Sequence, residues 1–557
     1  MLASIFAFDV TPKTIPEPFW DGLEIRSLCP PTGPVLPPPR VPHGFQLKGL
    51  KHDLDGFVRS QNRWNASTNS FSVMVTSGDG PFFSYHHTAP IKSENGVKIV
   101  DDHSIYRIAS VSKVFTTLAT LVEQNVSLDD TIGMYLKELD APGWQDVTLR
   151  LLAQQLSGVA RDVGVFDAGS QSEVMIPLGL PPLPVSDIPA CGNGTAPMCS
   201  REVFLQSLKD YGFTGQVAHR AAYTDIGYIL LGYVLEEVTG MKYSEVLTKS
   251  ILKPLGVHEI SATTPDASRG IIPIDGDDWF KLDFGYYAPT AGLYGSVDSL
   301  SVFLRSILSN TLMNQAKTNE WLKPSAFTTH EGYAVGAPWE IFRPVILTKY
   351  PRPTDHYTKT GGLPIYGSHI VLVPEYNLGV TVLGAGADVD DIVLPVLDIV
   401  QQRLIPALDK LARRQALEKY GGRYQSRDRN FLMTLTIDDG PGLKVSSWVN
   451  RGVDILKTWD VLLFRAKSLD EAEPVDIRLY PQGVGNRWTA QFTERRKATA
   501  NLHGEGPLAR VNCPDWLRVD NFRYGKKRLD EVDFLVDGTN SIKGLDIPGW
   551  RVKLDKI

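Results

Sequence analysis

The pattern of apolar residues changes near Tyr420, and this change restricts the chain to folds with at least two domains. Before it, strand-like and helical segments alternate, as in SFSVMVTS at 70–77 and DIGYILLGYVLEEVTG at 225–240. After it, short alternating segments such as FLMTLTI and VDFLVDG are separated by Gly, Pro, Asp and Asn. A chain of 557 residues with 43% hydrophobic content also exceeds what one core holds. The sequence therefore predicts an α/β domain followed by a smaller, mainly β domain.

Prolines and apolar periodicity set the predicted domain boundaries. Residues 28–42 read LCPPTGPVLPPPRVP, which favours an extended backbone, so residues 1–48 are predicted to form an arm. The α/β domain is predicted over 49–405, a helical linker over 406–419 and the β domain over 420–557. Strands are expected at 70–77 and around FFSYHHTA, and again only near 365–384, where a hairpin precedes a helix. The sheet would then be mixed and built from both ends of the domain.

The charge balance and the histidine spacing argue against several classes of function. The formal net charge is -6, and the basic residues are interspersed with acidic ones instead of forming a Lys/Arg stripe. Nucleic acid is therefore not an expected partner. The 4 cysteines and 11 histidines show no zinc-type spacing, which argues against a metal site. No stretch is long enough to span a membrane. The expected partner is a small molecule, and the sequence assigns no oligomeric state.

The cysteines and the glycosylation sequons favour a secreted protein or one of the secretory pathway. Cys191 and Cys199 flank a loop, ACGNGTAPMCS, that a disulfide can close; two buried reduced thiols are the alternative, typical of a cytosolic protein. We favour the disulfide. Asn65, Asn125 and Asn193 begin glycosylation sequons. The apolar start MLASIFAF, residues 1–8, is either an abbreviated signal peptide or a cloning remnant.

The strongest chemical signal is the segment RIASVSKVFTTLATLVEQ, in which a strand-like lead enters an amphipathic helix. Ser110 and Lys113 lie three residues apart and share a helix face, so the lysine amine can reach the serine hydroxyl. The helix N-terminus also offers backbone NH groups to a developing oxyanion. A lysine whose pKa is lowered by burial and nearby positive charge can accept the serine proton. Because Ser250 and Lys253 repeat the spacing, this motif alone does not establish a nucleophile.

Two further motifs follow in order: Tyr223-Thr-Asp225 at the start of a helix, and Lys359-Thr360-Gly361 before a glycine-rich strand region. With them the chain resembles the serine β-lactamase and penicillin-binding protein family, and looks closest to its class C and esterase-like branch. The resemblance covers roughly residues 50–405 and includes LLAQQLSGVARD at 151–162 and PTAGLYGSVDSLSVFLRSIL at 289–308. It implies a β-lactamase-like α/β fold: a mixed sheet flanked by helices, an inserted all-helical subdomain, and an active site between them.

The resemblance also implies which residues do the chemistry. Ser110 would be the nucleophile and Lys113 its proton acceptor. Tyr223 would be the acid and base that serves the leaving group and later activates water. Each of these roles requires hydrogen-bond reach between the groups.

The third motif would bind the substrate. Lys359 would line the cleft, where its charge keeps Tyr223 anionic or binds a substrate carboxylate; the alternative is a solvated surface lysine. Thr360 would add a hydroxyl donor, and Gly361 would leave the cleft unobstructed. The backbone NH of Gly362 would pair with that of the nucleophile to form the oxyanion hole.

Asp225 departs from the family pattern, because β-lactamases commonly carry an amide there that binds the acylamino group of the substrate. An ionised carboxylate cannot donate a hydrogen bond. Asp225 would therefore either pair with Lys113 or Lys359 and tune it, or receive a substrate donor that β-lactams do not supply. Both interpretations weaken antibiotic hydrolysis as the function.

The expected function is hydrolysis of an ester, lactone or amide through an acyl-Ser110 intermediate, with no metal and no diffusible cofactor. Acyl transfer to an alcohol or amine, as in secondary metabolism, would use the same residues and is an alternative. A catalytically silent binding or assembly protein on the same fold is a third hypothesis. The joint presence of Ser110, Lys113, Tyr223 and Lys359 disfavours it, because a cleft used only for binding has no evident need for all of them.

Overall fold

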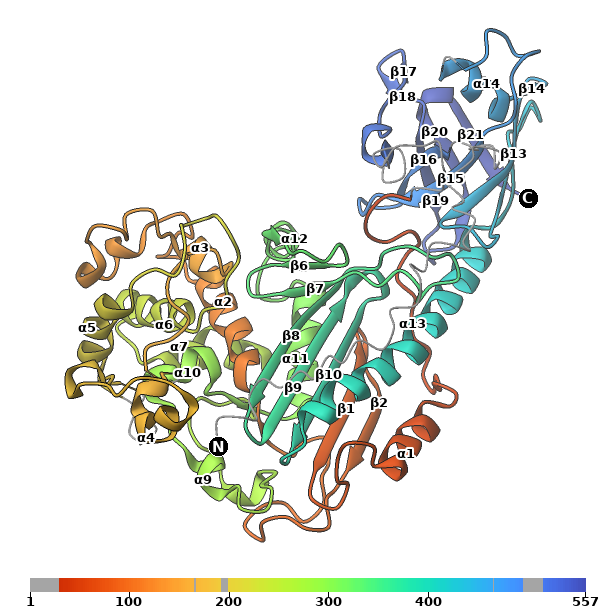
Figure 1. Cartoon of the computed structure of the whole chain (residues 1–557). Coiled ribbons are helices and arrows are strands. Elements are labelled where there is room, and N and C mark those ends of the chain that lie inside the picture. The colour runs from red at the N-terminus through yellow and green to blue at the C-terminus, as the bar shows by residue number, and fades with distance from the viewer. Residues whose placement is uncertain (1–29, 165–166, 192–198, 464, 494–513) are drawn as a thin grey trace.

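The computed structural model describes residues 30–164, 167–191, 199–463, 465–493 and 514–557. An α/β domain and a smaller β domain are joined by one long helix, α13 (Asp390–Tyr420), as Figure 1 shows. This helix runs without interruption from the predicted α/β domain through the predicted linker at 406–419. Residues 1–8 and the sequon at Asn193 lie outside the described residues. Among the described residues, no helix is both long enough and apolar enough to cross a membrane.

The α/β domain is built on a sheet with the order β2-β1-β10-β9-β8-β7-β6-β5. Strand β1 pairs with β10, with Ser70 opposite Ala385, so the two ends of the domain meet in the sheet as predicted. The predicted mixed sheet is wrong in one respect, because all the pairings of these described strands are antiparallel. Short hairpins join several neighbours, and hairpins can join only antiparallel strands. The strands are β1 (Ser70–Ser77), β2 (Gly80–His87), β5 (Ala326–Phe327), β6 (Tyr333–Val335), β7 (Glu340–Phe342), β8 (His356–Leu363), β9 (Tyr366–Val373) and β10 (Leu378–Ala385).

Four strands of this sheet, β5 to β8, precede residue 365, where the sequence pattern predicted that strands return. Strands β5, β6 and β7 have two or three residues each, too few to display an alternating pattern. Strand β8 contains Gly361 and Gly362, and glycine weakens the sequence signal of a strand. This correction matters for function, because β7 and β8 carry residues of the candidate site.

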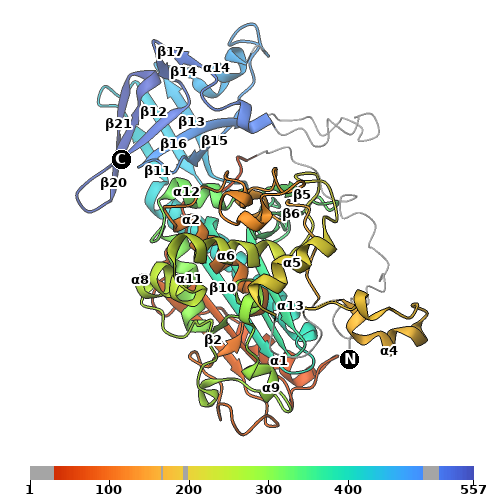
Figure 2. The same cartoon turned by 90° about the vertical axis from the view of Figure 1, so that its left-hand side faces the viewer.

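Helices cover both faces of the sheet. On one face, α1 (Leu50–Ser60) and α13 bury apolar residues such as Leu54 and Val396 against β1, β9 and β10. On the other face lie α2 (Ser112–Val122) and α11 (Val297–Leu308), whose Phe115 and Phe303 rings stack with centroids 3.9 Å apart. Figure 2 views the domain from this second side, with α2, α6 and α11 in front of the strands. The sheet therefore forms the middle of three layers.

An all-helical subdomain is inserted after α2 and has its own apolar core, which includes Leu152, Phe204 and Leu230. The predicted disulfide between Cys191 and Cys199 is confirmed and lies just before α5, with the two Cα atoms 5.2 Å apart. The helices of this part and of the segment leading back to the sheet are α3 (Leu149–Ala153), α4 (Ser172–Met175), α5 (Arg201–Tyr211), α6 (Ile226–Thr239), α7 (Tyr243–Leu247), α8 (Lys253–Leu255), α9 (Asp277–Lys281), α10 (Ala288–Ala291) and α12 (Gln315–Trp321), with a small β3 (Tyr106–Arg107) and β4 (Tyr294–Gly295) pair.

The C-terminal domain is an antiparallel barrel, because β12 pairs with both β11 and β13 and so closes the sheet on itself. Val35 and Leu36 of the proline-rich arm belong to its apolar core, together with Tyr420 from the end of α13. The predicted fold class is confirmed: an α/β domain with an inserted helical subdomain, followed by a mainly β domain. Its elements are β11 (Gly422–Gln425), β12 (Phe431–Thr436), β13 (Leu443–Asn450), β14 (Val453–Asp454), α14 (Ile455–Leu462), β15 (Asp476–Pro481), β16 (Arg487–Thr493), β17 (Arg523–Tyr524), β18 (Lys527–Arg528), β19 (Glu531–Val536), β20 (Ile542–Ile547) and β21 (Val552–Lys556).

Candidate active site

Ser110 lies in a tight turn that leads directly into α2. The turn is a 3-10 helix over Ala109–Val111, and α2 begins at Ser112. Ala109 has a φ of 45°, which is a left-handed backbone conformation. This conformation is energetically unfavourable for residues other than glycine. The Ser112 hydroxyl donates to the Ala109 carbonyl at 2.6 Å and accepts from the Leu293 amide at 3.1 Å, which holds this backbone in place. The Ser110 side chain is consequently presented at the start of a helix and remains partly exposed.

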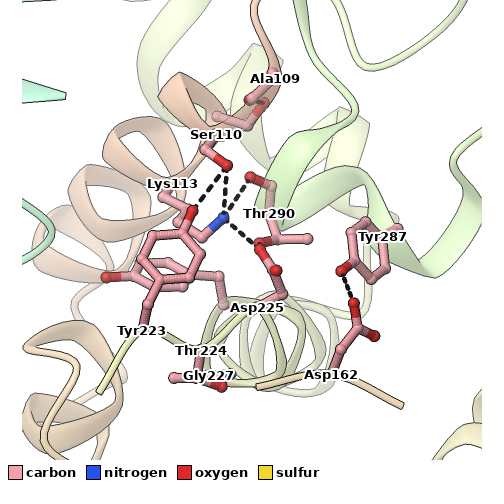
Figure 3. Close-up of polar contacts among 12 residues, drawn as sticks. Ala109, Ser110, Lys113, Asp162, Tyr223, Thr224, Asp225, Gly227, Tyr287 and Thr290 are labelled. Atoms are coloured by element: carbon pink, nitrogen blue, oxygen red, sulfur yellow. Dashed lines mark hydrogen bonds and ion pairs between the residues drawn. The ribbon is translucent and has the colours of Figure 1, made fainter. Parts of the chain in front are cut away.

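Lys113 projects from the first turn of α2 to the Ser110 hydroxyl. Its Nζ atom lies 3.1 Å from Ser110 Oγ and 3.1 Å from the backbone carbonyl of Thr290, as Figure 3 shows. The side chain is fully buried. Burial lowers the pKa of Lys113 below that of an ordinary lysine, and the charge of Asp225 opposes part of this shift. A buried lysine with a lowered pKa has the properties that a proton acceptor for a serine hydroxyl requires.

Asp225 pairs with Lys113. Its Oδ1 atom lies 2.6 Å from Lys113 Nζ and accepts the Thr290 hydroxyl, also at 2.6 Å. Burial alone would raise the pKa of Asp225, but the Lys113 charge outweighs it and holds this pKa below its usual range. The side chain is only 5% exposed, so a substrate donor arriving from solvent has little access to it. Of the two sequence interpretations, these contacts match the one in which Asp225 tunes Lys113.

The helical packing explains why Asp225 and Thr290 meet. Asp225 precedes the first residue of α6, and Thr290 lies in α10. A Cβ atom on Gly232 of α6 would lie 2.4 Å from a side-chain carbon of Pro289, so only glycine allows the two helices to approach this closely. The ion pair is therefore positioned by the close contact between α6 and α10.

Tyr223 reaches the same hydroxyl from the segment before α6. Its OH group donates to Ser110 Oγ at 2.8 Å. Three cationic groups face its ring: Lys113, Arg161 and Lys359, at 4.8, 5.0 and 5.4 Å from the centroid. Burial raises the pKa of Tyr223 above that of an ordinary tyrosine, and the Lys359 charge works against this rise. The resting tyrosine is therefore protonated and able to act as an acid.

Lys359 and Thr360 contact Glu340, a residue that the sequence analysis did not single out. Lys359 Nζ lies 2.6 Å from Glu340 Oε1, and the Thr360 hydroxyl donates at 2.9 Å. The Lys359 side chain is 1% exposed, so it is not the solvated lysine of the alternative interpretation. Burial alone would raise the pKa of Glu340, but the charge and hydrogen bond of Lys359 lower it below its ordinary value. Glu340 lies on the three-residue strand β7, and so short a strand gave no sequence signal.

Gly361 and Gly362 place β8 against the backbone of the nucleophile. A Cβ atom on Gly361 would lie 2.5 Å from the Ile108 carbonyl oxygen and 2.9 Å from the Ser110 amide nitrogen. Gly362, the next residue, is exposed and has open space where its Cβ would be. The two backbones thus run close together beside Ser110, as a pair of oxyanion-stabilising NH groups requires.

A second buried acid, Asp162, lies near Asp225. It is the last residue of the segment LLAQQLSGVARD, and the sequence predicted no role for it. Tyr287 donates a short hydrogen bond to its carboxylate (Figure 3). The Val163 amide also donates to it, at 2.6 Å. Burial, followed by the charge of Asp225, raises the pKa of Asp162 to about 7. An acidic residue next to apolar Val163 in the sequence was the available signal, but only the fold shows its proximity to Asp225.

One group of side chains in the described part of the chain has the donor set of a cation site. The ligand atoms of His103, Glu259 and Asp298 lie within 4.8 Å of one another. Glu259, however, already pairs with Arg269 at 2.6 Å and accepts the Ser296 hydroxyl at 2.6 Å. These contacts compensate its charge without an ion, and His103 is exposed. Among the described contacts, none joins this group to Ser110, Lys113, Tyr223 or Asp225, and we assign it no part in the chemistry.

Known proteins share both domains of this chain. The family model described as Beta-lactamase matches residues 36–398, and one described as Beta-lactamase-like-like, C-terminal domain, matches residues 412–557. A "Beta-lactamase-like protein" of Arthroderma benhamiae is 30% identical over 94% of this chain and 95% of its own length. "Probable hydrolase M10" of a Phoma species is 27% identical over 72% of this chain and 70% of its own length, and "Probable hydrolase clz13" of Cochliobolus lunatus is 26% identical over 77% and 75%. The first family model spans the sheet, the helical subdomain and every residue around Ser110, and the chain belongs to the beta-lactamase family.

Proposed function

We propose that this protein hydrolyses an ester, lactone or amide through a covalent acyl-Ser110 intermediate. The observation that carries the proposal is the position of the Ser110 hydroxyl between Lys113 Nζ at 3.1 Å and Tyr223 OH at 2.8 Å. Both groups can exchange a proton with it, and acyl transfer to serine needs an adjacent base and an acid for the leaving group. The two relatives named as probable hydrolases support the same reaction class.

Acylation proceeds from the neutral amine of Lys113, which the lowered pKa makes accessible although the resting lysine pairs with Asp225. Ser110 Oγ attacks the substrate carbonyl carbon, and this amine takes the hydroxyl proton. The carbonyl oxygen becomes an oxyanion, which accepts hydrogen bonds from the backbone NH groups of Ser110 and Gly362. The bond to the leaving group then breaks as Tyr223 donates its phenolic proton to the departing oxygen or nitrogen. At this stage the acyl group is on Ser110, Lys113 is an ammonium and Tyr223 is a phenolate.

Deacylation uses the same groups in reverse. The Tyr223 phenolate takes a proton from water, whose oxygen attacks the acyl carbon. The ester bond to Ser110 breaks, and Oγ takes back the proton held by Lys113. The acid product leaves, and all three residues return to their starting protonation states, which closes the cycle.

The test is intact-mass detection of the acyl adduct during turnover of p-nitrophenyl acetate. Ser250→Ala is the matched control, because Ser250 repeats the spacing to a lysine, but that lysine, Lys253, is exposed, and the Ser250 hydroxyl donates to the Val246 carbonyl at 2.7 Å. We expect the adduct in wild type and Ser250→Ala but not in Ser110→Ala, whose kcat/KM should fall at least about a thousandfold. Folded wild type that gives neither adduct nor turnover with p-nitrophenyl acetate, nitrocefin or a D-amino acid amide would contradict the proposal.

We also propose that the protein is secreted or enters the secretory pathway. The disulfide between Cys191 and Cys199 is typical of oxidising compartments, and the sequon residues Asn65 and Asn125 are both exposed. Exposed sequons can be glycosylated in that pathway. Protein isolated from its natural source should lose mass on treatment with an amide-linked glycan hydrolase; unchanged mass together with alkylatable Cys191 and Cys199 would argue for a reducing compartment.

A further inference from the structure

The hydrogen-bond donors next to the acyl site are already occupied by a carboxylate of the protein itself. Glu340 accepts from Lys359 Nζ at 2.6 Å, from the Thr360 amide at 2.8 Å, and from the Thr360 hydroxyl at 2.9 Å to each carboxylate oxygen. An ammonium, a hydroxyl and a backbone NH together form the donor set that would bind the carboxylate of a ligand. Both Glu340 oxygens are used, so Glu340 occupies the position of such a ligand.

These donors lie beside the reacting atoms. Lys359 and Thr360 directly precede Gly361, whose Cβ position is 2.9 Å from the Ser110 amide nitrogen. Lys359 Nζ also lies 5.4 Å from the centroid of the Tyr223 ring. A substrate whose carbonyl is bound at Ser110 would therefore have Lys359, Thr360 and the Glu340 carboxylate that they bind among its neighbours.

The charge of this subsite is compensated before a substrate arrives. The Lys359 side chain is 1% exposed and Glu340 is 16% exposed, so the ion pair is poorly screened by water. A second carboxylate placed there would face a like charge and would find the donors taken. A neutral group meets neither obstacle.

We infer that Glu340 is a specificity residue that excludes acyl substrates with a carboxylate beside the scissile bond and selects neutral esters, lactones or amides. This inference rests on the proposed function of Ser110 and narrows its substrate class. It follows that β-lactams, and peptides whose leaving group ends in a free carboxylate, are poor substrates. Glu340 exerts this effect through Lys359 and Thr360 and takes no part in proton transfer.

The experiment compares two phenyl esters that differ only in one charge: 3-acetoxybenzoate and its methyl ester, methyl 3-acetoxybenzoate. Values of kcat/KM, each divided by the rate of alkaline hydrolysis of the same ester, are measured for wild type, Glu340→Gln and Glu340→Ala. Glu331→Gln is the matched control, because Glu331 is an exposed glutamate that precedes β6 in the same part of the sheet. Thermal melting confirms that each variant is folded, and Glu340→Gln preserves the shape of the side chain if Glu340→Ala fails to fold.

We expect wild type and Glu331→Gln to prefer the neutral ester at least about a hundredfold, and Glu340→Gln to shift this preference at least about tenfold toward the carboxylate. Equal use of both esters by wild type, or the same preference in wild type and Glu340→Gln, would overturn the inference while leaving the acyl-enzyme proposal intact. A folded Glu340→Gln that is inactive on both esters would overturn it in favour of a positioning role. Absence of any Ser110 adduct in wild type with either ester would instead overturn the proposed function, and the inference with it.

Discussion

Three carboxylates lie in or beside the candidate site, and each has a different partner. Asp225 pairs with Lys113, Glu340 pairs with Lys359, and Asp162 accepts a hydrogen bond from Tyr287. Both lysines are thus compensated within the protein. The proposed reactivity of Ser110 therefore depends on the position and burial of Lys113 and Tyr223.

The protonation of Asp162 gives a prediction about stability. Its pKa is raised to about 7 in the folded protein, whereas an aspartate in an unfolded chain titrates near pH 4. A raised folded pKa stabilises the fold fully below the unfolded pKa, and this contribution is lost as the pH rises through the folded pKa. The free energy of unfolding should therefore fall between about pH 4 and pH 7, by up to about 4 kcal/mol from this residue.

Urea unfolding at several pH values, for wild type and Asp162→Asn, measures this effect. The asparagine does not titrate, so the variant should lose the part of the slope between about pH 4 and pH 7 that Asp162 contributes. Asp146→Asn is the control, since Asp146 is exposed in the same subdomain. Parallel stability curves for wild type and Asp162→Asn would refute the assignment.

At the level of elements, the contact between β8 and the turn before α2 brings together Gly362 and Ser110, whose backbone NH groups are the proposed oxyanion donors. Gly361 makes this contact possible, because its Cβ position is 2.4 Å from Ser368 Oγ and 2.5 Å from the Ile108 carbonyl oxygen. Gly361→Ala should therefore push β8 and the turn apart, destabilise the fold by about 1–3 kcal/mol and slow acylation of Ser110 at least tenfold.

Gly362→Ala is the matched comparison, because the added methyl group meets open space and the backbone NH is kept. It should change the free energy of unfolding by less than about 0.5 kcal/mol and leave acylation close to wild type. Denaturant unfolding and the rate of Ser110 adduct formation measure both effects. If the two alanine variants behaved alike, the close approach at Gly361 would not be what aligns the site.

The length of an element decided how far the sequence could predict it. β1, β9, β10 and α6 have long apolar patterns, and their positions follow from the sequence nearly residue by residue. Ser110 and Lys113 lie only three residues apart, in the 3-10 turn and in the first turn of the α2 helix that follows it, so their proximity was also predictable. Glu340 was not found because β7 has three residues, and because its contact with Lys359 spans 19 residues and depends on strand pairing.

At the scale of the whole molecule, the arm and the barrel share one apolar core that the sequence did not reveal. The proline-rich segment predicted only an extended arm, and its extended form is what lets it run beside α13 to the barrel, as Figure 1 shows. Along the way the Arg40 amide donates to Gln415 of α13 at 2.9 Å, and the Gln415 side chain donates back at 2.7 Å. Val35 and Leu36 then enter the barrel core. The first described residues thus complete the last domain.

Leu36→Ala tests this assembly. Leu36 is 4% exposed. Truncating a buried leucine lowers the free energy of unfolding by about 2–5 kcal/mol, and here the barrel should be the domain that is destabilised. Hydrogen exchange of backbone amides should therefore accelerate in barrel strands such as β16 and β20, while β1 and β10 of the α/β domain keep their protection. Leu417→Ala, at a 46% exposed position of α13, removes the same atoms and should leave both regions unchanged. Acceleration confined to the α/β domain, or none at all, would show that the arm is not part of the barrel core; the predicted pattern would mean that the barrel depends on a segment nearly 400 residues before it.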